Sequence, residues 1–347
     1  MKIQENFSLK PYNTFGIDAK AKFFSSFDST DELIEILTSN LEPQTSNFIL
    51  GGGSNVLFTK DYNGFVLKNE IKGIELMHED ESYVYVKAGA GENWHQFVLH
   101  CIKNNWAGIE NLSLIPGNVG AAPIQNIGAY GVELRDVFWG LETFHLAQKK
   151  KITFTLSDCQ FGYRESIFKN KYKDQFVILN LTLRLRKIPI FHTGYGTIQQ
   201  ELDKMARPDD PFGRGIKELS IKAISQAVIN IRSSKLPDPK EIGNAGSFFK
   251  NPSVTEEQYR KLKSEYKDII GFKNSDGTFK LAAGWLIEQC GWKGDRRGDA
   301  GVHEKQALVL VNYGNAKGRE IYDLSKEIIQ SLKEKFGVEL EREVNII

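Results

Sequence analysis

Hydrophobic and polar positions follow both the strand period and the helical period along this chain. Leucines at every second position from Leu179 to Leu185 alternate with polar residues, which predicts a strand with one buried face. Apolar residues at helical spacing between Trp94 and Ile102 predict a helix over 92–104. The spacing of Ser29 and Glu32 predicts an N-cap for another helix. We expect further strands over 48–50, 83–88, 307–311 and 338–347, and further helices over 218–232, 255–266, 281–290 and 321–336.

The two periods are interleaved irregularly, so the pattern predicts an α+β fold without regular βαβ alternation. Between the two halves, the segment 187–215 is rich in proline, glycine and charge and contains Arg207-Pro208-Asp209-Asp210-Pro211. We interpret it as a long loop at a domain boundary. The length of 347 residues is consistent with two or three modules.

Composition excludes several classes of partner. Lys and Arg number 45 against 44 Asp and Glu, so the chain has no basic field, and we expect no nucleic acid and no membrane surface among its partners. The three widely spaced cysteines, Cys101, Cys159 and Cys290, are typical of buried thiols in a reducing compartment. No apolar run is long enough to span a bilayer, which favours a cytoplasmic location. We expect no metal site, because no two histidines have the spacing of metal ligands. We also expect a monomer.

The first glycine cluster is Gly51-Gly52-Gly53-Ser54-Asn55, which lies between two short apolar segments. It does not open a helix and contains no Gly-Lys-Ser/Thr, so it matches neither the Rossmann nor the P-loop pattern. Consecutive glycines can still turn several backbone N–H groups toward one anion, such as a pyrophosphate. A tight β-turn is the plainer interpretation of this segment alone.

The second cluster runs from Ile115 to Gly131 and contains small residues, amides and two prolines with almost no charge. Such a segment is neither an ordinary solvated loop nor a regular helix. Small side chains allow the backbone to approach a flat or polyanionic ligand, and isolated amides can bond the edge of a heterocycle. The segment therefore favours a cofactor site, with a buried crossover between strands as the alternative.

Three further side chains have possible chemistry. Arg164 lies among aromatic residues and could bind a carboxylate, although a salt bridge with Glu165 is the plainer account. Ser247 lies between a glycine and two phenylalanines, but no Gly-x-Ser-x-Gly pattern marks it as a nucleophile. Glu341 and Glu343 share one face of the predicted terminal strand, where solvated carboxylates are the default.

Taken together and in order, these segments resemble the UDP-N-acetylenolpyruvoylglucosamine reductase family over nearly the whole chain. The landmarks are Asn13-Thr14-Phe15-Gly16, Gly51-Gly52-Gly53-Ser54-Asn55, Gly89-Ala90-Gly91-Glu92-Asn93-Trp94, Pro123-Ile124-Gln125-Asn126-Ile127-Gly128-Ala129-Tyr130-Gly131, Phe161-Gly162-Tyr163-Arg164, Lys235-Leu236-Pro237-Asp238-Pro239, Asn244-Ala245-Gly246-Ser247-Phe248-Phe249-Lys250-Asn251-Pro252 and Leu340-Glu341-Arg342-Glu343-Val344.

The resemblance implies an α+β fold in which a two-lobed FAD-binding region of the vanillyl-alcohol-oxidase type is joined to an α+β substrate-binding domain. We expect the first FAD lobe over 1–70, the second over 71–215 and the substrate domain over 216–337. The strand at 338–347 could return to the second lobe. The implied reaction is the NADPH-dependent reduction of the enolpyruvyl group of a UDP-sugar through FAD, in peptidoglycan precursor synthesis.

The family pattern also implies roles for particular residues. Arg164 and Glu343 would stabilise the negatively charged intermediate, and Ser247 would protonate it. The substrate or the nicotinamide would contact Tyr195, Lys235, Asn251, Lys293 and Gln306. FAD would be held by Gly51, Gly52, Gly53, Ser54, Asn55, Pro116, Gly117, Gly120, Ala121, Ala122, Ile124, Asn126, Ile127 and Gly128.

The chain departs from the family pattern at Ala121-Ala122, where serine is common, so backbone amides would replace a side-chain bond to the flavin. Tyr195 would be the substrate-loop tyrosine of the longer form of the family. Two other functions stay open. A flavoenzyme of the same fold could oxidise a sugar or hydroxy acid, and a protein without redox chemistry could simply bind a nucleotide sugar.

Overall fold

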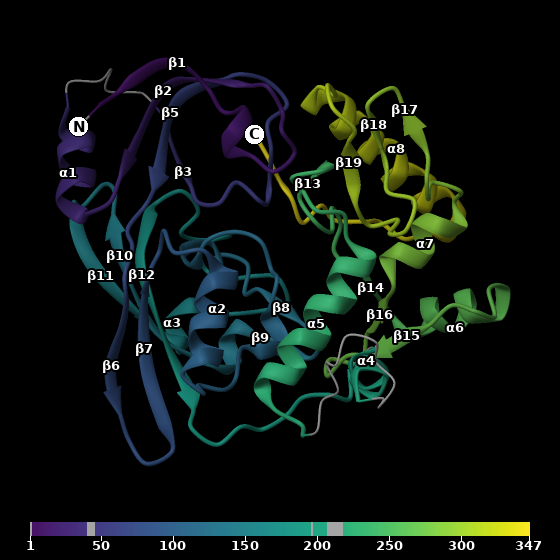
Figure 1. The fold of residues 1–347 in the computed structure, drawn as a ribbon. Coiled ribbons are helices and arrows are strands. Elements are labelled where there is room, and N and C mark those ends of the chain that lie inside the picture. The colour runs from purple at the N-terminus through teal and green to yellow at the C-terminus, as the bar shows by residue number, and fades with distance from the viewer. Residues whose placement is uncertain (1, 40–45, 196, 207–217) are drawn as a thin grey trace. The chain divides into compact units, whose positions relative to one another are not determined.

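A computed structural model describes residues 2–39, 46–195, 197–206 and 218–347 of the chain (Figure 1). Strands and helices are mixed in the irregular order that the sequence predicts, so the α+β class is confirmed. The chain forms two compact units. The first contains residues 1–7, 21–52 and 63–234, and the second contains 8–20, 53–62 and 235–347.

The first unit contains a four-stranded sheet of order β1-β2-β5-β3. Its strands are β1 (Gln4–Ser8), β2 (Lys20–Phe27), β3 (Asn47–Leu50) and β5 (Tyr62–Asn69), with β3 and β5 parallel. Helix α1 (Thr30–Thr38) begins where the Ser29 hydroxyl accepts a hydrogen bond from the backbone of Glu32. This predicted N-cap is confirmed, and Leu33 and Ile36 of the helix are buried in one cluster with Phe27, Phe65 and Leu67 of the sheet.

A second, antiparallel sheet of the first unit has the order β11-β10-β12-β7-β6. Its strands are β6 (Ile74–Glu79), β7 (Tyr83–Gly89), β10 (Phe138–His145), β11 (Lys150–Thr155) and β12 (Phe176–Arg186). The short helix α3 (Leu156–Cys159) lies between β11 and β12 in the sequence. The leucines at 181, 183 and 185 are buried, as their alternation predicts. A short hairpin, β8 (Gly128–Ala129) with β9 (Val132–Glu133), lies in the second glycine-bearing segment.

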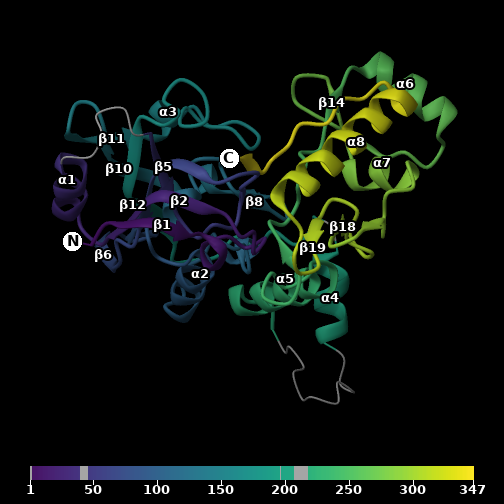
Figure 2. The same ribbon diagram turned by 90° about the horizontal axis from the view of Figure 1, so that it is seen from above.

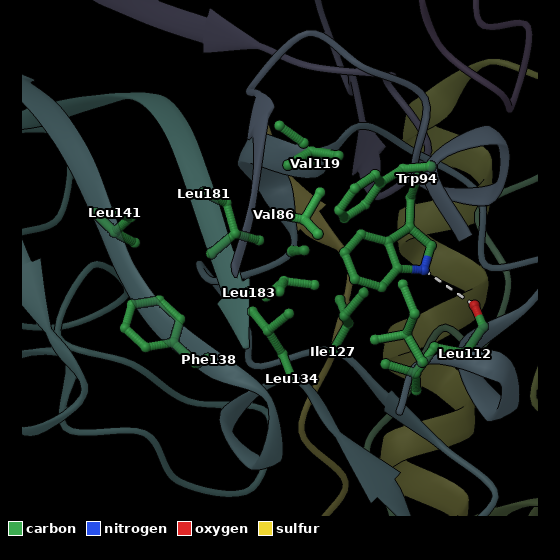
Figure 3. Close-up of a cluster of buried hydrophobic side chains, with 14 of the residues drawn as sticks. Val86, Trp94, Leu112, Val119, Ile127, Leu134, Phe138, Leu141, Leu181 and Leu183 are labelled. Atoms are coloured by element: carbon green, nitrogen blue, oxygen red, sulfur yellow. Dashed lines mark hydrogen bonds between the residues drawn. The ribbon is translucent and has the colours of Figure 1, made fainter. Parts of the chain in front are cut away.

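Helix α2 (Trp94–Lys103) packs its apolar stripe on this second sheet. Asn93 caps the helix by accepting a hydrogen bond from the backbone of Gln96. Figure 3 shows Trp94 within the cluster, and its indole N–H donates to the carbonyl oxygen of Leu112 at 3.0 Å. Trp94 is 1% exposed and shares this cluster with Val119 and Ile127 of the glycine-bearing segment. The core therefore positions that segment.

Part of the predicted long loop at 187–215 is helical, so the prediction is wrong there. Residues Ile198–Met205 form α4, and the next helix, α5, spans Ile221–Lys235. Ile198 and Leu202 of α4 are buried against Ala227 and Val228 of α5. The arginine- and proline-bearing stretch 207–211 lies outside the described residues.

The second unit is built from short strands and three α-helices, with a 3₁₀ helix at Lys10–Tyr12 (Figures 1 and 2). Helix α8 (Gly318–Phe336) packs on β18 (Ala300–Val302) and β19 (Leu310–Asn312), and α7 (Ala283–Gln289) packs on α8. Thr255 caps α6 through the backbone of Gln258, and Gly337 ends α8 in the left-handed conformation, both as predicted. The elements are β4 (Val56–Leu57), β13 (Gly243–Asn244), β14 (Ser253–Val254), α6 (Glu256–Glu265), β15 (Gly271–Lys273), β16 (Phe279–Leu281), α7 (Ala283–Gln289), β17 (Arg296–Arg297), β18 (Ala300–Val302), β19 (Leu310–Asn312), α8 (Gly318–Phe336) and β20 (Asn345–Ile346).

The terminal segment differs from the strand predicted over 338–347, because only β20 is a regular strand. It pairs in parallel with β4, which lies within residues 1–70 and not within 71–215. Helix α5 belongs to the first compact unit up to residue 234. The boundaries that we expect for the FAD lobes and the substrate domain stay a prediction.

Candidate active site

The first glycine cluster forms a turn directly after β3. A Cβ atom on Gly52 would lie 2.7 Å from the Cα of Gly117 and 2.9 Å from the Oδ1 of Asn118, so the two predicted cofactor segments touch at this point. Gly53 has a φ of +65°, which favours glycine. The backbone N–H groups of Gly52, Gly53 and Ser54 donate no hydrogen bond to any described residue. Consecutive free donors of this kind suit an anion such as a phosphate.

The second glycine-bearing segment is fixed to the junction of β7 and α2 by backbone hydrogen bonds. Gly120 donates to the carbonyl of Ala90 at 2.9 Å, and the carbonyl of Gly117 accepts from Trp94 at 2.9 Å. A Cβ atom on Gly120 would lie 2.6 Å from that of Ala90. The segment therefore requires glycine for close packing within the protein, in addition to any approach by a ligand.

These two stretches fit a flavin dinucleotide. Gly51, Gly52, Gly117 and Gly120 provide backbone without side chains, and the turn supplies spare donors for a pyrophosphate. The side chain of Ala121 is exposed and that of Ala122 is buried, so the alanine pair offers no polar side-chain group. Of the other predicted contacts, Pro116 is exposed, Ile124 and Gly128 are partly exposed, and Ile127 is buried.

Asn126, which we predicted to bind the cofactor, is fully buried and uses its side chain inside the protein. Its amide donates to the Gly162 carbonyl at 2.9 Å and to Glu133 at 3.0 Å, and its Oδ1 accepts from the backbone of Arg135. The side chain therefore holds neighbouring loops, and any contact of Asn126 with a cofactor has to come from its backbone.

Arg164 reaches back to the same segment. Its guanidinium donates to the carbonyl oxygens of Gly128 and, at 3.5 Å, Asn126, and lies over the Tyr163 ring at 5.4 Å from the centroid. Glu165, the residue of the plainer salt-bridge interpretation, forms an ion pair with Lys169 at 3.6 Å. The structure thus brings a predicted catalytic cation to a predicted cofactor segment.

Sequence reasoning missed a second arginine in this neighbourhood. Arg232, near the end of α5, donates through Nε to the Leu114 carbonyl at 3.2 Å. Burial lowers the pKa of Arg232, Tyr130 opposes that shift, and the charge of Arg164 adds to it. Burial, followed by the charge of Arg232, also lowers the pKa of His95. Arg232 lies three residues before the motif Lys235-Leu236-Pro237-Asp238-Pro239, and this proximity is the available signal in the sequence.

Tyr195 lies at the edge of this group. Its Cβ is 3.3 Å from where a Cβ on Gly131 would be, so the tyrosine packs on a glycine whose φ is +82°. Tyr195 is 51% exposed, which leaves the ring accessible to a ligand.

In the second unit, Ser247 and Glu343 lie on adjacent antiparallel segments. The carbonyl of Phe248 accepts from the backbone N–H of Glu343 at 2.9 Å, and Phe249 pairs with Arg342. The side chain of Asn55 donates to the Glu343 carbonyl at 3.3 Å. The structure therefore brings together Asn55 from the first glycine turn, the serine segment and the terminal glutamate.

The remaining predicted contacts of the second unit are dispersed. The Oδ1 of Asn251 accepts from the backbone N–H of Ala283 at 3.0 Å at the start of α7, and Gln306 lies against Gly284 of the same helix. Lys293 forms an ion pair with Glu288 at 2.9 Å. Lys235 is exposed.

Two arrangements are absent from the part of the chain that is described. No group of three or more His, Cys, Asp and Glu side chains is arranged to hold a metal ion there. Within the same residues, no helix is both long enough and apolar enough to cross a bilayer.

Comparison with family models gives two matches. Residues 238–347 match the C-terminal domain of UDP-N-acetylenolpyruvoylglucosamine reductase, and residues 21–147 match an FAD binding domain. The second match contains both glycine clusters, and the first contains Ser247 and Glu343.

Similar proteins agree with these models. The UDP-N-acetylenolpyruvoylglucosamine reductase of Flavobacterium johnsoniae is 51% identical, with 100% of both chains covered. The enzyme of the same name from Amoebophilus asiaticus is 50% identical over the same share of both chains. The crystal structure of the Thermus caldophilus reductase has a TM-score of 0.65 at 22% identity, covering 100% of this chain and 99% of that one, and supports the fold.

Proposed function

Because the chain belongs to the UDP-N-acetylenolpyruvoylglucosamine reductase family, we propose that it reduces the enolpyruvyl group of UDP-N-acetylglucosamine enolpyruvate to UDP-N-acetylmuramate. The hydride donor is NADPH, and the reaction belongs to peptidoglycan precursor synthesis. The observation that carries the proposal is the contact of Arg164 with the segment that contains the second glycine cluster. An FAD bound there supplies the relay that accepts a hydride from NADPH and delivers it to the substrate.

Arg164 has the chemistry that the second half of this reaction needs. Hydride delivery to the terminal methylene leaves negative charge on a carbon next to a carboxylate. A guanidinium fork binds a carboxylate with two parallel hydrogen bonds and stays charged throughout. The carbonyls of Gly128 and Asn126 orient Arg164, which reduces the reorganisation needed when the substrate arrives.

Ser247 and Glu343 complete the reaction in this proposal. Ser247 gives its hydroxyl proton to the carbanion, which requires close placement because a hydroxyl is a weak acid. Glu343, as a protonated carboxyl, donates a hydrogen bond to the same intermediate. Its backbone bond to Phe248 fixes it on the strand-like pair next to Ser247, which supports a shared role.

The UDP-sugar and the nicotinamide are bound by Tyr195, Lys235, Asn251, Lys293 and Gln306. The exposed positions of Tyr195 and Lys235 support binding of a large polar ligand. Two lysines suit a pyrophosphate, because each contributes a compact positive charge. We also propose that the protein acts in the cytoplasm as a monomer, without nucleic-acid or membrane partners.

An anaerobic spectroscopic sequence tests this function. The pure protein should be yellow, lose its visible flavin absorption on addition of NADPH, and regain it when the enolpyruvyl UDP-sugar is added. A colourless protein that still binds UDP would favour the nucleotide-sugar-binding alternative. Reduction of the flavin by an alcohol but not by NADPH would favour an oxidase of the same fold.

A further inference from the structure

Asn111 connects two segments that are far apart in the sequence. It lies in the short 3₁₀ helix Glu110–Leu112 and is 1% exposed. Its side-chain amide donates to the carbonyl of Tyr130 at 3.0 Å and to the carbonyl of His192 at 2.8 Å. Tyr130 lies in the turn between β8 and β9, and His192 lies in the stretch between β12 and α4 that contains Tyr195.

The identity of the two partners fixes the orientation of this amide. Both are carbonyl oxygens, which accept but cannot donate, so only the NH₂ group can satisfy them. The Oδ1 of Asn111 is buried and has no hydrogen-bond partner among the described residues. Leaving this acceptor unpaired costs free energy. The two hydrogen bonds of the NH₂ group still fix the orientation, because a flipped amide would place its oxygen against the two carbonyls and lose both bonds.

The stretch 188–195 has few other attachments. Within the described residues, the bond from Asn111 to His192 is the one hydrogen bond that this stretch makes. Phe191 packs on the cluster of α4 and α5, to which Tyr130 also contributes. Ile188 and Ile190 are 78% and 51% exposed. The Asn111 amide is therefore the polar anchor of this stretch, in addition to the packing of Phe191 and the packing of Tyr195 against Gly131.

We propose that Asn111 is a positioning residue for substrate binding, which clamps the stretch containing Tyr195 to the turn containing Tyr130. Asn111 is buried and both hydrogen bonds of its amide go to backbone carbonyls, so it acts through Tyr195 and not on the substrate directly. The inference rests on the proposed function, since it assumes that Tyr195 binds the UDP-sugar.

The substitution Asn111→Asp tests the clamp because it keeps the shape and removes the donors. A carboxylate would face two carbonyl oxygens and repel both. Asn69→Asp is the matched control. Asn69 is also buried in the first unit, where its amide donates to the Ile178 carbonyl at 2.9 Å, but it does not touch the clamped stretch. Asn111→Ser, which keeps one hydroxyl donor, is the milder second variant in case Asn111→Asp does not fold.

Limited chymotrypsin digestion measures the attachment directly. Cleavage after Phe191 and Tyr195, identified by mass spectrometry, reports how often the stretch opens. Losing two buried hydrogen bonds should accelerate cleavage at these sites on the order of 10-fold in Asn111→Asp, and less in Asn111→Ser. Asn69→Asp should be cleaved there at the wild-type rate. Equal cleavage of wild type and both Asn111 variants would overturn the clamp.

Kinetics in a double-mutant cycle test the connection to the reaction. Asn111→Asp should raise the KM for the enolpyruvyl UDP-sugar on the order of 10-fold, while flavin reduction by NADPH changes by less than about 2-fold. In a Tyr195→Ala background, Asn111→Asp should add no further increase in KM. A full additive increase there would overturn positioning through Tyr195. If the wild type has no reductase activity at all, the proposed function fails, and the digestion still decides whether Asn111 anchors the stretch.

Discussion

The neighbouring glycines Gly51 and Gly52 should respond very differently to alanine. At Gly52 the new methyl would meet the Cα of Gly117 at 2.7 Å and the Oδ1 of Asn118 at 2.9 Å. At Gly51 its nearest neighbours would be the Cβ atoms of Asn118 and Ala121 at 3.7 and 3.8 Å, which is ordinary contact. Neither glycine has a positive φ, so backbone strain does not distinguish them.

The expected magnitude follows from this geometry. The contact with the Gly117 backbone is about 1 Å too short and cannot be relieved by rotating a side chain, so overpacking should cost about 1–3 kcal/mol. Alanine also lowers the conformational entropy of the unfolded chain, which stabilises the folded state by about 0.4–1 kcal/mol at either position. We therefore expect Gly52→Ala to lower the free energy of unfolding by about 1–2 kcal/mol. Gly51→Ala should be neutral or slightly stabilising.

Urea titration of the FAD-free proteins measures the difference, because a bound ligand would add its own stabilisation. Gly52→Ala should unfold at a lower urea midpoint than wild type, with an unchanged slope. Gly51→Ala is the matched control, since it makes the same chemical change one residue earlier. Equal midpoints for the two variants would refute the close packing of Gly52 against Gly117.

Four further predictions concern the candidate site and the core. Ser247→Ala should slow reoxidation of the reduced flavin by the enolpyruvyl substrate by at least about 10²-fold and leave reduction by NADPH near normal in stopped-flow assays; equal slowing of both steps would make Ser247 structural. Arg164→Lys should impair the same step, because the single ammonium group of lysine cannot bind a carboxylate with the two parallel donors of a guanidinium. Wild-type turnover of this variant would contradict the catalytic role of Arg164. Trp94→Phe leaves a buried carbonyl unpaired and should destabilise by about 1–3 kcal/mol in urea titrations, whereas an unchanged midpoint would exclude that bond as a contributor. Burial raises the pKa of the Cys159 thiol to about 12 and also raises the pKa of the Cys101 thiol, so at about pH 8 neither should react with a disulfide reagent before unfolding; rapid labelling of the native protein would contradict their burial.

Elements with a complete local signal could be predicted from the sequence. Helix α2 was predicted over 92–104 and spans Trp94–Lys103, because a continuous apolar stripe follows the capping residue Asn93. Helix α4 was missed although Ile198 and Leu202 have helical spacing. Its stripe is short, and its stability depends on burial against α5, which the local sequence does not contain.

The terminal segment shows how a correct burial pattern can give a wrong element. Val338, Leu340 and Val344 are buried, as their spacing predicts. The backbone of 341–343 pairs with 248–250 through two hydrogen bonds and one bridge, without a regular ladder. The alternation therefore predicts which side chains of the terminal segment are buried. It does not predict the hydrogen-bond partner, which is a segment about 90 residues away in the chain.

The residues of the candidate site also fall into two groups, those that the sequence identifies and those that it does not. Residues within motifs, such as Arg164 and Ser247, could be named from the sequence because the resemblance to a family identified them. Asn111 and Arg232 could not, because their partners are backbone carbonyls that the fold brings to them. A carbonyl has no sequence signature, so side chains that serve the site by binding backbone are the group that sequence reasoning misses.

Arg164 and two other non-glycine residues near it adopt the left-handed backbone conformation, which is disfavoured for residues with a side chain. Asn126, Tyr130 and Arg164 itself have φ values of +41°, +50° and +54°. Such backbone persists only where surrounding contacts enforce it, and here the contacts are the saturated amide of Asn126, the Asn111 bond to Tyr130 and the two carbonyls that Arg164 binds. Arg164 is thus part of what holds the backbone around it. A substitution at this position changes local geometry as well as charge, so its catalytic role has to be judged from the ratio of the two half-reactions and not from overall turnover.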